Sequence, residues 1–186
     1  MGEVVMKPLL LVSLLLLLCG CQTLSAPVKP QIPLGQGLVW SLPDLGWVKG
    51  ERDKTQQVVA WHGKERWQLV GQLSLSPQKM TLTALSGFGT FLFQANFDGT
   101  VLTTKRSALV PAKANPGHLL ADLSMALMPT AVLQQSLAPL GLVLSVKDHR
   151  RVISKQGKAI IVIEYQPMGF RFSQQQLGYG FEVTYE

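Results

Sequence analysis

Apolar and polar residues alternate strictly along three successive stretches between residues 67 and 97, and this pattern constrains the fold most. A period of two is typical of β-strands in a sheet that buries one face. Turn sequences separate the stretches, and one of them, Asp98-Gly99, is a strong hairpin signal. The pattern therefore predicts an antiparallel meander. Its inward-facing positions are Trp67, Leu69, Gly71, Leu73, Leu75, Met80, Leu82, Ala84, Phe91, Phe93, Ala95 and Phe97.

Two short helices are predicted between residues 115 and 140. Asn115 and Pro116 supply an N-cap followed by a proline at the first helical position. Pro129 ends the first helix, and the second runs from Thr130 to Leu137. The first helix is expected to bury one stripe against the sheet. That stripe consists of Leu119, Leu120, Leu123, Leu127 and Met128.

Strands resume after Gly141 and continue to the end of the chain. The run from Ala159 to Ile163 is apolar on both faces, which predicts a strand inside the sheet rather than at its edge. Counting all runs, we expect a mainly β (α+β) fold of about nine to eleven strands with a helical pair in the middle.

The beginning of the chain has the features of an export signal. Lys7 precedes an apolar run from Leu9 to Leu18, which is too short for a transmembrane helix. The sequence Leu18-Cys19-Gly20-Cys21 then resembles the lipobox of bacterial lipoprotein precursors. That resemblance implies that residues 1–20 are removed and that Cys21 is lipidated. The alternative is an ordinary signal peptide that is cut near Ala26.

Prolines and glycines between residues 22 and 43 predict an extended spacer. We therefore divide the chain into a signal peptide at 1–20, a lipidated Cys and tether at 21–48, and one domain at 49–186. After cleavage Cys21 is the only cysteine, so no internal disulfide is expected. The net charge of +6 is scattered, and no nucleic-acid-binding motif occurs, so we expect no nucleic-acid partner.

Two local sequences resemble the LolA/LolB class of periplasmic lipoprotein carriers. They are Leu85-Ser86-Gly87-Phe88-Gly89 and the helical segment from Ala121 to Pro129, which is followed by Leu133 and Leu137. More closely, the chain resembles a family of uncharacterised outer-membrane lipoproteins that is related to that class and often encoded beside aryl-polyene pigment synthesis genes. The resemblance covers roughly Val58 to Glu186.

The resemblance implies an incomplete antiparallel β-barrel whose apolar concave face is covered by the two helices. Such a face suits acyl chains, because their burial needs no specific polar contact. The candidate cavity-lining residues are Trp67, Phe91, Phe93, Leu120, Leu123, Met128 and Phe172. Taken singly, each of these residues is more simply explained as part of a packed core.

Phe88 is the candidate membrane-contact residue, because the matching loop of the membrane-anchored carrier projects an apolar residue. The alternative is an aromatic side chain that folds back onto the sheet. Gln22 follows Cys21, and the bacterial sorting rule then implies the periplasm-facing side of the outer membrane.

No catalytic or metal-binding pattern is evident, so we expect neither an enzyme nor a cofactor nor a metal site. His62, His118 and His149 lack ligand spacing. His118 and Asp122 are one helical turn apart, which fits a base with its orienting group or, more simply, a pair at the surface.

Two functions remain. The first is an outer-membrane lipoprotein that binds lipid or acylated cargo and assists its transfer or localisation. The second is a non-catalytic structural or adaptor lipoprotein that binds a protein partner through a sheet edge. A carrier should contain an apolar cavity of several hundred Å³, whereas an adaptor should have a filled core.

Overall fold

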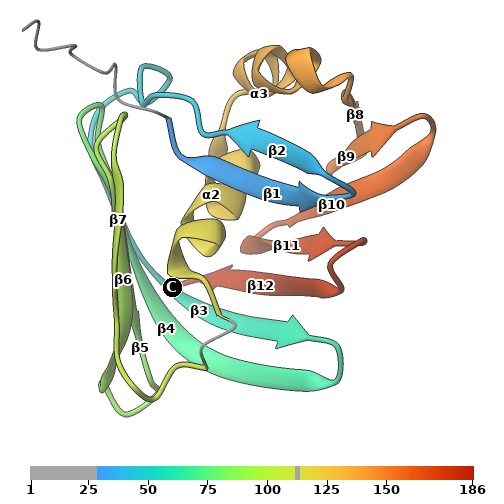
Figure 1. Cartoon of the computed structure of the whole chain (residues 1–186). Helices are drawn as coiled ribbons and strands as arrows, with labels where there is room; N and C mark the ends of the chain where they lie inside the picture. Colours follow the sequence, from blue (N-terminus) through green and yellow to red (C-terminus); the bar gives the residue numbers. More distant parts are fainter. Residues whose placement is uncertain (1–28, 112–113) are drawn as a thin grey trace, which may run out of the picture.

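The computed structural model describes residues 29–111 and 114–186, which form twelve strands and two α-helices (Figure 1). A mainly β fold with an unclosed antiparallel sheet and two short helices was predicted, and it is confirmed. The strands are β1 (Gln31–Gly35), β2 (Leu38–Ser41), β3 (Arg52–His62), β4 (Glu65–Leu75), β5 (Met80–Leu85), β6 (Phe91–Phe97), β7 (Leu102–Arg106), β8 (Val143–Lys147), β9 (Arg150–Lys155), β10 (Lys158–Gln166), β11 (Gly169–Gln174) and β12 (Tyr179–Tyr185). The helices are α2 (Pro116–Leu127) and α3 (Thr130–Leu137), followed by the 3₁₀ turn η1 (Ala138–Leu140).

Ten strands form one antiparallel sheet in the order β7-β6-β5-β4-β3-β12-β11-β10-β9-β8. The last strand, β12, pairs with β3, so the two halves of the meander join at the middle of the sheet. β10 lies inside the sheet between β9 and β11, as its apolar run predicted. The edges of the sheet are β7 and β8, which do not pair with each other, so the barrel stays open.

The alternating pattern correctly identified the inner face of β4, β5 and most of β6. Leu69, Leu73, Leu82, Ala84 and Phe93 are all buried. The predicted hairpin at Asp98-Gly99 is present, but its connection is four residues long. Oδ1 of Asp98 accepts the backbone N–H groups of Thr100 and Val101, which shapes the turn.

The boundaries of both helices were predicted correctly. Oδ1 of Asn115 accepts the N–H groups of Gly117 and His118, which caps α2, and Pro129 separates α2 from α3. The single buried stripe expected on α2 is wrong, because Ala121, Asp122, Ser124 and Met125 are buried as well. None of the helices in the described residues is long and apolar enough to span a bilayer.

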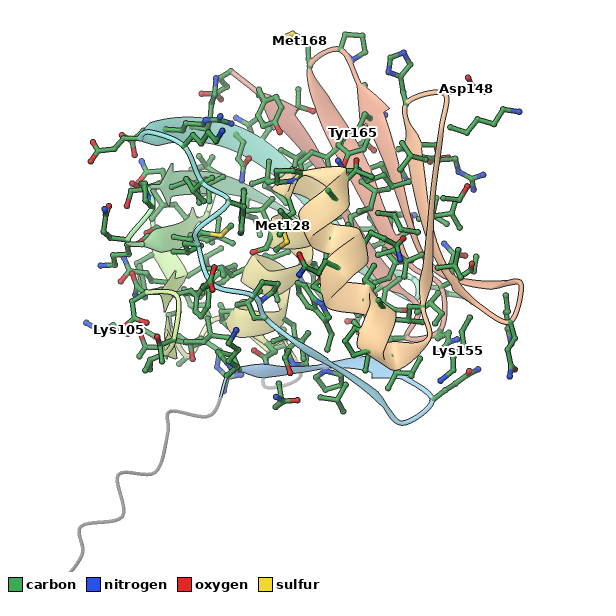
Figure 2. All side chains as sticks on the ribbon, turned by 90° about the horizontal axis from the view of Figure 1, so that it is seen from above. Lys105, Met128, Asp148, Lys155, Tyr165 and Met168 are labelled. Atoms are coloured by element: carbon green, nitrogen blue, oxygen red, sulfur yellow. The ribbon has the colours of Figure 1, made fainter. Side chains whose placement is uncertain are left out.

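The elements around α2 explain why it is buried on so many sides. α2 packs against β6, β7 and β11, and hairpin β1–β2 packs against α3 and η1. The sheet curves around the two helices, and the hairpin closes the side that the sheet leaves open (Figures 1 and 2). A helix enclosed in this way must be apolar around most of its circumference.

The predicted tether at 21–48 is wrong from residue 31 onward, because this part belongs to the folded domain. Ile32, Leu34, Trp40 and Leu42 are almost completely buried. Nε1 of Trp40 donates to Oγ of Ser136 on α3, and Nε2 of Gln174 donates to the carbonyl of Leu34. Prolines set a spacer-like composition here, but burial of these apolar side chains outweighs it. Every described element therefore lies between residues 31 and 185.

Candidate functional site

The concave inner face of the sheet is the candidate site, and α2 occupies it. Of the predicted lining residues, Phe93, Leu120, Leu123, Met128 and Phe172 are buried in a single apolar cluster. Trp67 is partly buried, and Phe91 lies at the rim, where its side chain is 40% exposed. The structure thus brings most of these residues together as core.

The space between α2 and the sheet is almost filled. The described residues leave a void of about 10 Å³ there, which is room for about one water molecule. An open cavity of several hundred Å³, which the carrier hypothesis required, is absent between these elements. The void is lined by Gln56, Val58, Leu69, Leu82, Phe93, Leu119, Leu123, Phe181 and Val183.

Gln56 places a polar group beside this void. Its side chain is buried, and its Oε1 has no hydrogen-bond partner among the described residues. The strand residue opposite is Gly71, where a Cβ would approach Nε2 of Gln56 to 3.1 Å. The glycine therefore makes the room that the amide needs, and a single bound water would satisfy Oε1.

A second polar contact joins α2 to the sheet deep in the core. The hydroxyl of Tyr179 on β12 donates to Oδ2 of Asp122 at 2.7 Å, while Oδ1 of Asp122 has no described partner. Burial raises the pKa of Asp122 to about 8, although the bond from Tyr179 acts in the opposite direction. Asp122 is therefore largely protonated and uncharged at neutral pH.

The expected pairing of His118 with Asp122, as a catalytic or a surface pair, is wrong. Asp122 is completely buried and bonds to Tyr179 instead. Burial lowers the pKa of His118, which makes this half-buried imidazole neutral at pH 7. Sequence reasoning missed Tyr179, although its place in the alternation with Phe181 and Val183 puts it on the inner face.

The C-terminal end of α2 is held by two side chains of the sheet. Nη1 of Arg151 donates to the carbonyls of Met125 and Met128 at 3.2 and 2.8 Å. The hydroxyl of Tyr165 donates to the carbonyl of Ala126 at 2.6 Å (Figure 2). These donors satisfy carbonyls that the end of a helix leaves free, and the guanidinium charge complements the helix dipole.

Phe88 projects from the turn between β5 and β6, and its side chain is 100% exposed. The turn is well ordered by its own hydrogen bonds: the N–H of Gly89 donates to the carbonyl of Ser86, and the N–H of Phe88 donates to Oγ of Ser86. An aromatic side chain that folds back onto the sheet was the alternative, and the exposure of Phe88 contradicts it.

The outer face of the sheet is largely polar over β3, β4 and β5. A shallow groove of about 380 Å³ lies over β3, β4 and β5, and hydroxyl, amide and carboxylate side chains line it. Its polar lining residues are Asp53, Lys54, Thr55, Gln72, Ser74, Thr81 and Thr83. Acyl chains require apolar walls, so the inner face is the better match for them.

The two edges of the sheet differ in how they are covered. At β8 the backbone N–H of Leu144 donates to Oε1 of Gln134 on α3, so the helix satisfies one edge group. At β7, Thr103, Thr104 and Lys105 are exposed, so this edge is open to a partner strand, although the charge of Lys105 disfavours unselective pairing.

Cys21 lies outside the described residues, so its predicted lipidation stays a prediction. Within the described parts of the chain, no group of three or more His, Cys, Asp or Glu side chains is placed to hold a metal ion.

The chain matches the model of a protein family over most of its length. No curated protein matches the chain. Residues 53–185 match the model of a family described as a protein of unknown function, DUF3261. This range contains the whole ten-stranded sheet except Arg52, together with both helices. Because the match covers more than half of the sequence, the chain belongs to the DUF3261 family.

Proposed function

We propose that this protein is a membrane-anchored carrier of acyl chains in the bacterial envelope, and that α2 fills the binding site while no cargo is bound. The observation that carries the proposal is the position of α2, enclosed between the concave apolar face of the sheet and hairpin β1–β2. An acyl chain would take the place of the leucine and methionine side chains that α2 now packs against the sheet.

The energetics of this exchange are favourable in principle. Burial of an acyl chain contributes about 0.8 kcal/mol for each methylene, so a long chain offsets the loss of several leucine contacts. The remaining cost is the release of α2 from its polar partners Tyr179, Tyr165 and Arg151. A neutral hydrogen bond contributes about 1 kcal/mol and a bond from a charged group such as Arg151 about 1.5 to 3 kcal/mol, which leaves the exchange within reach of cargo binding.

The resemblance to the LolA/LolB class supports the proposal, since those carriers share an incomplete barrel covered by helices. The finer resemblance, to lipoproteins encoded beside aryl-polyene synthesis genes, makes an acylated envelope molecule the expected cargo. In this proposal Cys21 anchors the chain in the outer membrane, residues 22–30 serve as its tether, and Phe88 contacts the membrane surface.

An adaptor function is the second candidate, and the void of only about 10 Å³ favours it. In that case the packed core is permanent, and a protein partner would pair with the β7 edge at Leu102–Arg106. Such an adaptor binds no acyl chain.

Binding of a fluorescent long-chain fatty acid separates the two functions. In a carrier, Tyr165→Phe removes the bond to Ala126 and should tighten fatty-acid binding by about three- to ten-fold, because α2 is released more easily. Tyr185→Phe is the matched control: Tyr185 also lies at the inner face, but its hydroxyl makes no described hydrogen bond. Absence of fatty-acid binding in all three proteins, and of acyl species in mass spectra of the purified protein, would favour the adaptor.

A further inference from the structure

Two turns of the chain share one construction. In the first, Ser86 accepts the N–H of Phe88 with Oγ at 3.3 Å and the N–H of Gly89 with its carbonyl at 2.9 Å. In the second, Ser107 accepts the N–H of Leu109 with Oγ at 3.0 Å and the N–H of Val110 with its carbonyl at 3.2 Å. Each turn thus fixes an apolar residue at its third position.

Both apolar residues face water. Phe88 is 100% exposed and Leu109 is 70% exposed. A turn held by a serine side chain and by a backbone bond is ordered, so these side chains are presented from fixed positions. Large apolar side chains in water carry a free-energy cost that contact with an apolar phase removes.

The two turns lie side by side at one end of the sheet. β6 pairs with β7, and beyond the paired residues the N–H of Ser107 donates to the carbonyl of Leu92 at 2.8 Å. Phe91, which is partly exposed, begins β6 between them. Figure 1 shows the β5–β6 turn and the segment after β7 together at the lower end of the sheet.

Charge is distributed unequally between the two ends. The end that carries Phe88 and Leu109 also contains the β3–β4 hairpin, because β3 and β7 end there and β4 and β6 begin there. Its exposed charged residues are Lys64, Glu65, Arg66, Lys105 and Arg106. The opposite end, counted in the same way over residues 42–54, 76–79 and 98–101, carries four cations and four anions: Lys49, Arg52, Lys54, Lys79, Asp44, Glu51, Asp53 and Asp98. Among the described residues of β3–β7 and their connections, cations therefore predominate at the end with the exposed apolar residues.

We infer that this end is a docking surface for an anionic bilayer, into which Phe88 and Leu109 both insert. The inference rests on the proposed function for the role of Phe88, and it adds a second insertion point, Leu109, and the charge of the partner. Single apolar tips between cations fit a bilayer, because headgroups attract the cations while the tips reach the acyl region. The core of a protein interface would instead need a continuous apolar patch.

Vesicle co-sedimentation tests the docking surface. The chain from Gln22 onward contains every described element and lacks the leader, so its binding reports the folded domain. Leu109→Ser should weaken binding to phosphatidylglycerol vesicles by about ten-fold. Val101→Ser is the matched control, because Val101 is also exposed but lies at the opposite end, and its binding should equal that of the parent protein.

Charge reversal provides an independent comparison. Lys105→Glu should weaken binding to phosphatidylglycerol vesicles by about ten-fold or more, whereas Lys79→Glu at the opposite end should change it far less. Binding to phosphatidylcholine vesicles should be weak for every variant. Circular dichroism and thermal melting confirm that each variant is folded.

Three results would overturn the inference: no binding of the parent protein to phosphatidylglycerol vesicles, equal binding to phosphatidylcholine, or parent-like binding by Leu109→Ser. Failure of the proposed function is a separate result, since it is measured as absence of fatty-acid binding in solution. A protein that binds fatty acid but no vesicle keeps the carrier function and loses the docking surface, together with the membrane contact proposed for Phe88.

Discussion

The hydroxyl of Tyr179 donates a 2.7 Å hydrogen bond to Oδ2 of Asp122, joining the last strand of the sheet to the helix that it encloses. Both groups are removed from water, and burial raises the pKa of each. An uncharged carboxyl group with one hydrogen bond costs less in the core than a carboxylate, which lacks the partners that it needs there.

This contact predicts that stability falls as pH rises. The pKa of Asp122 is about 8 in the folded protein, against a reference value of 3.8. Between these values the unfolded chain has released the proton and the folded protein retains it, so each pH unit lowers the unfolding free energy by up to about 1.4 kcal/mol. Below the reference value both states are protonated, and above the folded pKa both are ionised, so this contribution is constant there.

Asp122→Asn tests the assignment, because the amide oxygen can still accept from Tyr179 and carries no charge. We expect urea unfolding between pH 4 and pH 9 to show that the unfolding free energy of the variant falls less steeply with rising pH than that of the parent protein. The variant should also be the more stable protein at pH 9. Parallel stability curves for the two proteins would contradict a raised pKa at Asp122.

A second prediction concerns the end of α2. Arg151→Ala removes hydrogen bonds to the carbonyls of Met125 and Met128, and we expect it to lower the unfolding free energy by about 2 to 3 kcal/mol. Arg150→Ala is the control, since Arg150 is exposed and its ion pair with Glu164 contributes little. Chemical denaturation measures the unfolding free energy of both variants. Equal decreases for Arg151→Ala and Arg150→Ala would show that Arg151 does not hold the end of α2.

The folded hairpin gives a third prediction. Trp40→Ala should lower the unfolding free energy by about 3 to 5 kcal/mol, because the indole is fully buried and donates to Ser136. Val39→Ala, on the exposed side of the same strand, should cost less than about 1 kcal/mol. Thermal melts of the two variants measure the difference. If Trp40→Ala changes the stability only slightly, residues 31–48 would belong to the tether and not to the folded domain.

Lipidation gives a fourth prediction, which concerns the two cysteines. Cells grown with an alkyne-tagged fatty acid should label the parent protein, and Cys21→Ala should lose the label. Cys19→Ala should retain it, because Cys19 lies in the segment whose removal the lipobox resemblance predicts. Label on the Cys21→Ala protein would contradict the lipobox assignment.

Much of the fold was predictable from local patterns. Alternation placed Leu69, Leu82 and Phe93 on the inner face, because successive side chains of a strand point to opposite faces. Asn115 and Pro129 marked the ends of α2 through capping and proline geometry, which depend on neighbouring residues only.

The candidate site was less predictable. Leu120, Leu123 and Phe172 lie in one buried cluster, but whether such residues line a cavity depends on how tightly α2 packs. Tyr179 lies 57 residues from its partner Asp122, so their contact follows from the pairing of β12 with β3 and the path of α2 between them.

The sequence by itself determined the strands, the helices and their ends, since each follows from periodicity or from contacts between near neighbours. Only the tertiary structure decided that residues 31–48 belong to the domain, that Asp122 is buried, and that Phe88 and Leu109 share one end of the sheet. The physical reason is that burial depends on contacts between segments distant in the chain. The proline-rich composition before residue 48 and the charged side chain of Asp122 on α2 both indicated exposure to water. Contacts with segments distant in the chain bury much of residues 31–48 and of α2 instead.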